Sequence, residues 1–380
     1  MSYNIPNLPL GVDLEDKRIL KQLAKSSRLL GELKGVAEKI PNKDILISAL
    51  TLMEAKDSSE VENIVTTHDE LYKADLSIST REFSVSLATK EVMNYREAIH
   101  IGYNLVKKNA ILSNSNIKKI QQTLEGNIAG FRTVPGTILK DNKQNVIYTP
   151  PQDVNVINEL MQNLEQFIND DSISDLDCLV KMAVIHHQFE SIHPFYDGNG
   201  RTGRIICILY LVAKGLLDLP ILYISRYITQ NKAEYYRLLQ AIRETENNEQ
   251  QWRDWVYFML VGVEQVAQDT IVLIEGISKL MSEYKIILKP VFGRIYKHEL
   301  LNNLFFHPYT KIEYLERDMM VTRKTATKYL DMIVEEKLLD KMRIGKNNYY
   351  INTQLINLFT NHQTSSDNLV ESIESVYNID

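Results

Sequence analysis

The stretch from His193 to Arg204, HPFYDGNGRTGR, combines a backbone and side chains that could handle a phosphate group. Glycines let the backbone approach an oxyanion closely, and the first amides of a helix have no partner within the helix. Together with the helix dipole, the N–H groups of Gly198 to Arg201 are expected to form an anion site. The apolar residues that follow, IICILYLVAKGLL, predict a buried helix from near Arg201 to about Leu216 that anchors the loop.

The side chains of the same stretch point to a reaction at a phosphate. Arg201 and Arg204 lie three residues apart, so they share a face of the first helical turn and would bind successive phosphates. Asp197 precedes the turn, where a carboxylate suits Mg²⁺. His193 is the nearby group that accepts a proton near neutral pH. Together they predict the attack of a hydroxyl on a nucleotide phosphate.

Two other interpretations of this stretch are weaker. Residues 198–203 match the dinucleotide fingerprint GxGxxG, but they are expected to follow a helix and not a strand. The histidines His186, His187 and His193 suggest zinc, but the sequence has neither an HExxH pattern nor a cysteine partner beside them. A polyphosphate site is therefore favoured.

The elements that must position these residues are mostly helical. Apolar residues recur at helical spacing, which predicts a mostly α fold. Examples are Leu23, Leu30 and Leu33, then Ile45, Ala49, Leu52 and Met53. A helix from Leu176 to Phe189 is expected to lead into the loop. Residues Asn231 to Glu234 read as a capping box that opens a helix through about Glu244.

Two segments predict β-hairpins. The first, Phe131 to Pro151, has β-rich ends around the turn-prone residues 141–143. The second, Lys341 to Asn352, has two short runs separated by residues 345–347. Across the chain, we expect an N-terminal helical region, a helical core, a small C-terminal module and a polar tail. Their predicted bounds are 1–100, 101–285, 290–355 and 360–380.

Composition limits the classes of function. The net charge of -6 provides no overall attraction to nucleic acid or to an anionic membrane. The two cysteines, Cys178 and Cys207, form neither a metal-type pair nor a disulfide pattern, as in a reducing compartment. The N-terminus does not read as a signal peptide, and polar residues break the apolar stretch Trp252 to Ile274. We therefore expect a cytoplasmic protein with no membrane partner.

The loop matches the signature HPFx(D/E)GNGRxxR at every specified position, and the preceding IHHQFESI also fits. On these residues the chain resembles the Fic (Fic/Doc) family of protein adenylyltransferases, over roughly residues 50–260. The resemblance implies a Fic-type helical bundle with a β-hairpin flap. It also implies the transfer of AMP from Mg-ATP to a Ser, Thr or Tyr hydroxyl of a target protein, with release of pyrophosphate.

The resemblance assigns roles to the loop residues. His193 would be the general base, Asp197 would hold Mg²⁺ between the α- and β-phosphates, and Asn199 and the glycine amides would hold the α-phosphate. Arg201 would bind the outer phosphates, Arg204 the γ-phosphate, and Phe195 would be a packing anchor. The implied nucleotide-binding set is Asp197, Gly198, Asn199, Gly200, Arg201, Thr202, Gly203, Arg204, Tyr235 and Tyr236.

The first hairpin resembles the family flap, with Thr137 and Ile138 binding the target segment by main-chain pairing. An ordinary surface hairpin is the alternative. Many relatives carry glycines just after the position of Ile138, where this chain has Leu139 and Lys140, so the conformation of the flap is expected to differ in detail. The pair Tyr235 and Tyr236 resembles tyrosines of the adenine pocket. Arg243 stands where some relatives have asparagine.

A second resemblance concerns regulation. Residues 58–63, SSEVEN, resemble the inhibitory motif (S/T)xxxE(G/N) of Fic proteins, with Ser58, Glu62 and Asn63 at its specified positions. Ser58 and Glu62 share a helix face, and Glu62 would bond to Arg204 in the place of the γ-phosphate. This predicts autoinhibition, and an acidic helix in solution is the alternative.

Residues 310–352 resemble a winged helix: a short helix, a break at residues 319–321, a longer helix from about Arg323, and a hairpin. Basic residues lie on the longer helix and in the wing, so DNA is one partner to consider and a protein surface is the other. They are Arg323, Lys324, Lys328, Arg343 and Lys346.

Alternatives to AMP transfer stay open at this point. One is a DNA-binding regulator that senses nucleotide. Another is the same pocket transferring UMP, phosphocholine or phosphate, or removing AMP with Glu62 activating water. Self-modification, a homodimer, the target protein and the nucleobase preference are not decided by the sequence.

Overall fold

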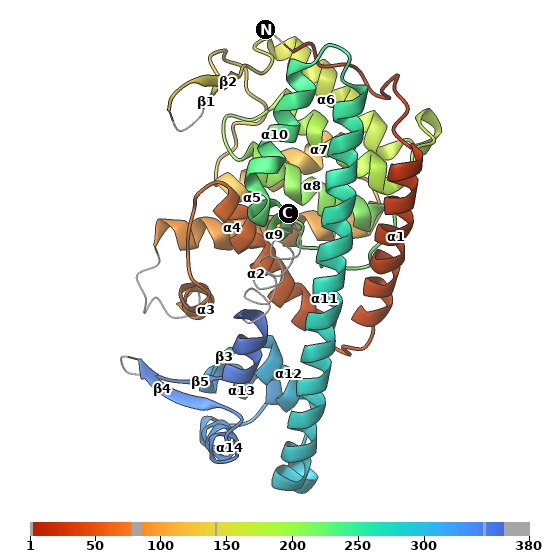
Figure 1. Cartoon of the computed structure of the whole chain (residues 1–380). Helices are drawn as coiled ribbons and strands as arrows, with labels where there is room; N and C mark the ends of the chain where they lie inside the picture. The colour runs from red at the N-terminus through yellow and green to blue at the C-terminus, as the bar shows by residue number, and fades with distance from the viewer. Residues whose placement is uncertain (1–2, 78–85, 141–142, 345–346, 361–380) are drawn as a thin grey trace, which may run out of the picture. The chain divides into compact units, whose positions relative to one another are not determined.

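The computed structural model describes residues 3–77, 86–140, 143–344 and 347–360. α-Helices dominate these ranges, and the strands are few and short, which confirms the predicted mostly α class (Figure 1). The chain forms two units: one contains residues 1–34, 50–71 and 84–268, and the other contains residues 35–49, 72–83 and 269–380. The division into regions at 100, 285 and 355 stays a prediction.

The first unit holds most of the helices. They are α4 (Leu87–Asn109), α5 (Asn114–Glu125), α6 (Val154–Asn169), α7 (Cys178–Ile192), α8 (Asn199–Ala213), α9 (Ser225–Gln230) and α10 (Lys232–Glu244). A 3-10 turn, η1 (Asp171–Ile173), follows α6. Four further helices have residues in both units: α1 (Lys17–Ala37), α2 (Lys43–Val61), α3 (His68–Ser77) and α11 (Glu249–Phe292).

Helices α7 and α8 form the centre of the first unit. α8 is buried over nearly all of its length, which confirms the predicted buried helix, and α7 is buried from Leu179 to Ile192. α8 begins two residues earlier than predicted because Gly198, with φ 75°, turns the chain directly into the helix. It ends before Gly215, which has φ 69°. The free cysteine Cys207 is buried on α8.

The predicted capping box at the start of α10 is wrong, although the bounds of the helix are close to those expected. The side-chain amide of Asn231 donates backwards to the carbonyl of Tyr227 at 2.9 Å and caps no N–H of α10. Glu234 pairs with Arg237 instead of reaching back. A backbone carbonyl of the preceding helix α9 thus takes the side chain that would have capped α10.

Helix α11 contains the apolar stretch from Trp252 to Ile274. By length and composition it is the one described helix that could span a membrane. However, 61% of its most apolar window is buried inside the protein, and the core helix of a soluble protein meets the same criteria. The side chains of Trp252 and Trp255 are fully buried, which agrees with the predicted core helix.

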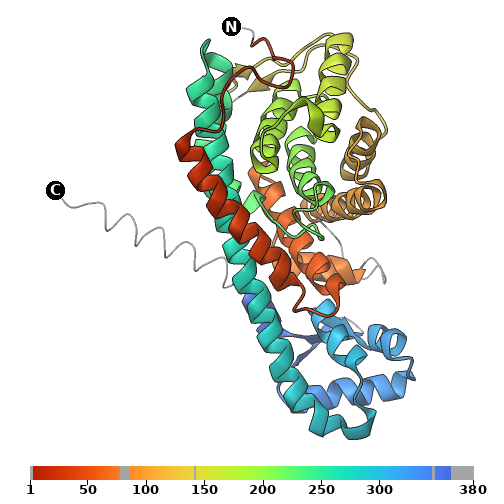
Figure 2. The ribbon, with the colours of Figure 1, turned by 90° about the vertical axis from the view of Figure 1, so that its right-hand side faces the viewer.

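The C-terminal module belongs to the second unit (Figure 2). After the short turn η2 (Gly293–Ile295), its elements are α12 (His298–Phe306), β3 (Tyr309–Lys311), α13 (Ile312–Met319), α14 (Arg323–Glu335), β4 (Asp340–Ile344) and β5 (Asn347–Ile351). The strands form an antiparallel sheet in the order β3-β5-β4. The expected break between the helices lies at Met320, which has φ 52°. Residues 345–346 of the predicted turn lie outside the described ranges.

The first hairpin is present but short. β1 (Leu139–Lys140) pairs with β2 (Val146–Tyr148) in antiparallel register, with an irregularity between Leu139 and Lys140. Two residues of the predicted turn, 141–142, lie outside the described residues. The two ends of the hairpin are joined, because the side chain of Gln152, after β2, donates to the carbonyl of Thr137, before β1, at 3.0 Å.

Candidate active site

The loop between α7 and α8 is shaped by its own residues. His193 ends α7 in a left-handed conformation, with φ 49°, and its N–H donates to the carbonyl of Phe189. The side chain of Asn199 bonds to both backbone groups of Phe195, at 2.8 and 2.9 Å, and is buried. That amide is committed to the loop, so a phosphate contact at residue 199 would come from the backbone N–H.

Two more residues of the implied nucleotide-binding set, Thr202 and Gly203, lie in the protein interior. Thr202 is fully buried, and a Cβ on Gly203 would lie 3.0 Å from a carboxylate oxygen of Glu190 and 3.2 Å from the ring of Phe189. Gly203 therefore permits the close approach of α8 to α7. Phe195 is buried between the rings of Phe131 and Phe189, at 5.2 and 6.3 Å, in the position of a packing anchor.

A cavity of about 490 Å³ opens beside the loop. His193, Gly200 and Arg204 all line it, so the histidine and the buried arginine border the same space. The other lining residues are Val61, Glu62, Asn63, Leu139, Lys140, Ile147, Glu190, Lys232, Tyr235, Tyr236, Leu239, Gln240 and Arg243. An imidazole, the glycine-rich start of a helix and a buried arginine thus border one space that could hold a ligand.

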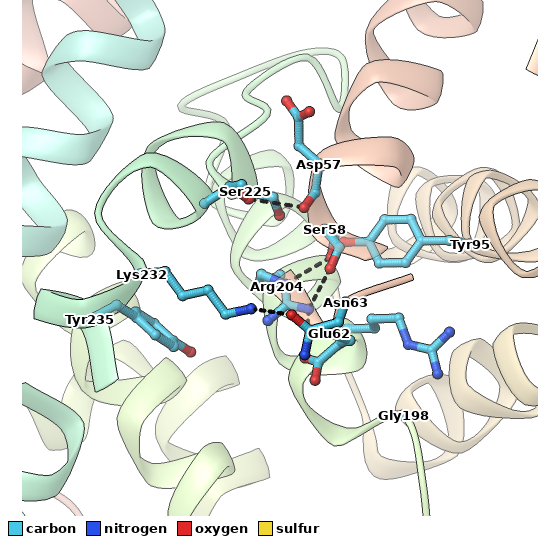
Figure 3. Close-up of polar contacts among 12 residues, drawn as sticks. Asp57, Ser58, Glu62, Asn63, Tyr95, Gly198, Arg204, Ser225, Lys232 and Tyr235 are labelled. Atoms are coloured by element: carbon cyan, nitrogen blue, oxygen red, sulfur yellow. Dashed lines mark hydrogen bonds and ion pairs between the residues drawn. The ribbon is translucent and has the colours of Figure 1, made fainter. Parts of the chain in front are cut away.

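Arg204 is held by the N-terminal motif (Figure 3). Its Nε donates to Ser58 Oγ at 2.7 Å, and its Nη2 donates to Ser58 O and Glu62 Oε1, both at 3.0 Å. Burial alone would lower the pKa of Arg204, but the charge of Glu62 raises it above the usual value. The structure therefore brings together the arginine and the carboxylate that the resemblance paired.

Glu62 also covers the start of α8. A Cβ on Gly200 would lie 2.4 Å from Glu62 Oε1, so the carboxylate rests directly on the glycine backbone. The next residue, Asn63, has φ 63°, a conformation that glycine and asparagine tolerate best. Its side chain accepts from Lys232 Nζ at 2.9 Å (Figure 3). This backbone conformation explains why the motif specifies Gly or Asn there.

The other arginine is also paired, by residues that sequence reasoning missed. Arg201 donates to Glu125 Oε1 at 2.9 Å and to Glu91 Oε2 at 3.1 Å. A Cβ on Gly198 would lie 2.3 Å from Glu125 Oε1, so this carboxylate covers Gly198 in the way that Glu62 covers Gly200. Glu125 ends α5, far from the loop in sequence and outside any motif.

Asp197 is exposed, and its Oδ1 accepts the N–H of Gly198 at 2.7 Å. One of the four amides expected to be free is thus occupied. Within the described ranges, no group of three or more His, Cys, Asp and Glu side chains could hold a metal ion. A lone exposed carboxylate beside a phosphate cradle still fits Mg²⁺, which takes one or two carboxylates and otherwise phosphate oxygens and water.

The environment of His193 favours the neutral imidazole. Burial, and then the charges of Arg243 and Arg132, lower the pKa of His193 to about 4. At neutral pH the ring is therefore unprotonated, which is the form that a proton acceptor must have. Glu190, one turn earlier on α7, also lines the cavity. Burial raises the pKa of its carboxyl group to about 7.

The two tyrosines differ in their surroundings. Tyr235 is buried, with its hydroxyl 2.8 Å from His186 Nε2 and its ring against Trp255, so most of it belongs to the core. Tyr236 is 44% exposed and also lines the cavity. On the hairpin side, Ile138 is exposed. The roles of these residues and of Thr137 stay predictions.

The fold and the site define a mostly helical protein in which a glycine-rich helix start, an arginine and a histidine line one cavity. Three family models match its sequence: Fic/DOC family N-terminal over residues 20–104, Fic/DOC family over 111–211, and protein adenylyltransferase SoFic-like, C-terminal domain, over 280–355. The chain belongs to the Fic/DOC family.

Curated relatives share limited stretches with the chain. It is 27% identical to protein adenylyltransferase Fic of Drosophila erecta over 173 residues, 44% of this chain and 33% of that protein. It is 31% identical to protein adenylyltransferase fic-1 of Caenorhabditis elegans over 85 residues, 22% and 15% of the two chains. A probable protein adenylyltransferase of Aquifex aeolicus matches at 26% over 157 residues, 41% of each chain. The match therefore spans less than half of each relative.

Solved structures support the fold. A Fic family protein from Desulfovibrio desulfuricans G20 has a TM-score of 0.56 at 18% identity, covering 90% of this chain and 98% of that one. Fic-1 from C. elegans has a TM-score of 0.52 at 19% identity, covering 68% and 73%. The predicted Fic-type helical fold is confirmed.

Proposed function

We propose that the protein is an adenylyltransferase that transfers AMP from ATP to a hydroxyl side chain of a target protein. The observation that carries the proposal is the cavity shared by His193, Gly200 and Arg204. An imidazole with a lowered pKa faces the helix start and guanidinium that suit a triphosphate. The names of the curated relatives support the same activity.

The chain's own groups would hold the nucleotide. The amides at the start of α8 and the two arginines, Arg201 and Arg204, would bind the phosphates once their carboxylate partners move. Asp197 would hold Mg²⁺. When bound, this ion neutralises phosphate charge and helps to orient the triphosphate. The half-exposed ring of Tyr236 would contact the base.

His193 would perform the proton transfer. The imidazole takes the proton of the target hydroxyl as that oxygen attacks the α-phosphorus. The bond between the α-phosphorus and the oxygen bridging to the β-phosphorus breaks, and pyrophosphate leaves with the bonding electron pair. AMP remains on the protein as a phosphodiester. Positioning and charge stabilisation supply most of the catalysis in such a transfer.

Glu62 would inhibit this reaction in the resting protein. Its carboxylate bonds to Arg204 and lies over Gly200, where a phosphate oxygen would need to be. ATP that enters the cavity without displacing Glu62 would lack the arginine and part of the helix start. Autoinhibition by the chain's own N-terminal motif is thus part of the proposal.

The test is the mass of the product. The Glu62→Gly protein is incubated with ATP, Mg²⁺ and host lysate, and modified residues are mapped by mass spectrometry. An adenylyl adduct on Ser, Thr or Tyr, absent with Glu62→Gly/His193→Ala, is expected. A uridylyl, phosphocholine or phosphate adduct would redirect the assignment to another transferred group, and adducts on the enzyme itself would indicate self-modification.

We also infer that residues 298–351 form a winged helix, on the strength of the order α12-β3-α13-α14-β4-β5 and the three-stranded sheet. A protein surface is the favoured partner, for example a second copy in a homodimer. Arg323, on the candidate recognition helix, is paired with Glu313 at 2.6 Å, and Lys341 is paired with Asp331 at 2.7 Å. These contacts reduce the positive charge that the two side chains could offer to DNA. Salt-sensitive retention of duplex DNA in a filter-binding titration would reverse this preference.

A cytoplasmic location is likewise proposed from the sequence.

A further inference from the structure

Arg132 is a buried arginine that the loop signature does not include. It lies just ahead of the hairpin, and 1% of the residue is exposed. Its Nε donates to the carbonyl of His193 at 2.7 Å, and its Nη2 donates to the carbonyl of Pro151 and, at 3.4 Å, to that of Ile192. Its backbone N–H donates to the carbonyl of Pro194 at 2.8 Å. Arg132 therefore binds the backbone on both sides of His193.

The backbone of His193 needs such support. A left-handed conformation at a residue other than glycine costs on the order of 1 kcal/mol, and it persists where surrounding contacts enforce it. The backbone dihedrals of His193 also set the direction in which its imidazole leaves the chain. Fixing the carbonyls of Ile192 and His193 therefore fixes the direction of the Cα–Cβ bond from which the imidazole starts.

The same guanidinium ties this backbone to the hairpin. Arg132 and Pro151 lie at opposite ends of the hairpin segment, and Arg132 joins both ends to the catalytic loop. Neighbouring contacts act in the same direction: the N–H groups of Thr133 and Val134 donate to the hydroxyl of Tyr196 at 2.9 and 3.1 Å. The hairpin segment and His193 thus share one anchor.

General stabilisation is a weaker explanation for this residue. In the described part of the chain, the acceptors of the Arg132 side chain are backbone carbonyls, and its Nη1 is buried with no hydrogen-bond partner. A buried cation without a carboxylate partner recovers little of its desolvation cost. Burial accordingly lowers the pKa of Arg132. The forked geometry, which lysine cannot reproduce, is what this site uses.

We infer that Arg132 is a positioning residue that fixes the direction of the His193 side chain relative to the hairpin, which by the family resemblance would present the target hydroxyl. The inference rests on the proposed function. Arg132 is not among the residues that line the described cavity, so it would act on the transfer step and leave nucleotide binding unchanged.

The experiment compares three variants in the Glu62→Gly background. Arg132→Lys retains the charge and loses the fork, and its rate of AMP transfer should fall about 100-fold, as expected for a displaced catalytic group. Its ATP affinity should stay within about twofold of the parent's, since the cradle is untouched. Arg132→Met should lose as much rate and, because a cation near His193 is gone, should also move the acid limb of the pH–rate profile upward.

Lys118→Met is the matched control, since Lys118 Nζ lies 4.1 Å from the ring centroid of Phe131 and bonds no carbonyl of the loop. It should transfer AMP at the parental rate. The His193 ring resonances, assigned by their loss in His193→Ala, provide a readout that does not need turnover, and they should move in Arg132→Lys and not in Lys118→Met. Thermal unfolding checks that each variant is folded.

An Arg132→Lys protein with the parental rate and unchanged His193 resonances would overturn the inference. So would a loss of ATP affinity as large as the loss of rate. If the Glu62→Gly parent itself transfers nothing, the proposed function fails, whereas the resonances still decide whether Arg132 orients His193.

Discussion

The glycine-rich start of α8, the proposed phosphate cradle, has two ends, Gly200 and Gly198. A carboxylate covers each end, but the two carboxylates come from different kinds of sequence. At one end Glu62 covers Gly200 and pairs with Arg204 at 3.0 Å; at the other, Glu125 covers Gly198 and pairs with Arg201 at 2.9 Å. In each case a carboxylate takes both the glycine surface and the guanidinium that a phosphate would use. The first belongs to a short sequence motif, whereas the second comes from the end of α5.

The ends also differ in how readily they would open. The side chain of Glu62 is 36% exposed and follows the last residue of α2, whereas that of Glu125 is 13% exposed within the last turn of α5. Arg201 also keeps a second partner, Glu91. We therefore expect Glu62 to control access of the terminal phosphate and Glu125 to make a smaller contribution.

The largest effect should come from replacing His193, because transfer needs the proton acceptor whichever carboxylate is removed. His193→Ala removes the general base, so AMP transfer should fall about 100-fold to 10,000-fold, even where Glu62 or Glu125 has been replaced. Transfer of label from [α-³²P]ATP measures this. If His193→Ala keeps its activity in the Glu62→Gly background, the cradle does not work with this imidazole.

Opening the Glu62 end should give the next largest effect. Glu62→Gly removes a hydrogen bond between charged groups, which contributes about 1.5–3 kcal/mol, so transfer should rise about 10-fold to 100-fold. The initial rate at saturating ATP is the measurement. An unchanged rate would remove the autoinhibition proposal while leaving the transferase assignment intact.

Opening the Glu125 end should have a smaller effect of the same sign. Glu125→Gln keeps the shape and removes the charge, and in the Glu62→Gly background it should tighten ATP binding about fivefold, the equivalent of about 1 kcal/mol. Glu91→Gln is the matched control, because Glu91 also pairs with Arg201 but does not cover Gly198. Equal effects of the two variants, or weaker ATP binding in Glu125→Gln, would contradict the comparison of the two ends.

The smallest effect concerns pH. Because the pKa of His193 is lowered to about 4, the imidazole is neutral throughout the physiological range. The contribution of His193 to the transfer rate should therefore be independent of pH until the rate falls on acidification toward that value. Arg243→Met removes the larger of the two cationic influences and should move this fall to higher pH. The pH–rate profile of Glu62→Gly with and without Arg243→Met tests both statements.

Sequence reasoning located the parts of this site that are local in the chain. The glycine-rich turn, the buried helix behind it and the position of Ser58, Glu62 and Asn63 were all visible as short patterns. The pairing of Glu62 with Arg204 was proposed from the two motifs together, and the structure places these side chains in contact.

Contacts between distant segments were not visible. Neither Glu125 nor Arg132 lies in a motif, and only folding brings α5 and the start of the hairpin to the loop. The capping box at Asn231 failed because α9 lies just before it and offers a carbonyl to the same side chain. The role of the Asn199 side chain also depends on the loop conformation, which a pattern does not specify.

The central claim is that the Glu62 carboxylate takes the place of the terminal phosphate at Arg204. Calorimetric titration of ATP and ADP into the unaltered protein and into Glu62→Gly tests it most directly. ATP should bind more tightly than ADP in Glu62→Gly, and the preference should be lost or much smaller when Glu62 is present. The same ratio of ATP to ADP affinity in both proteins would contradict the claim.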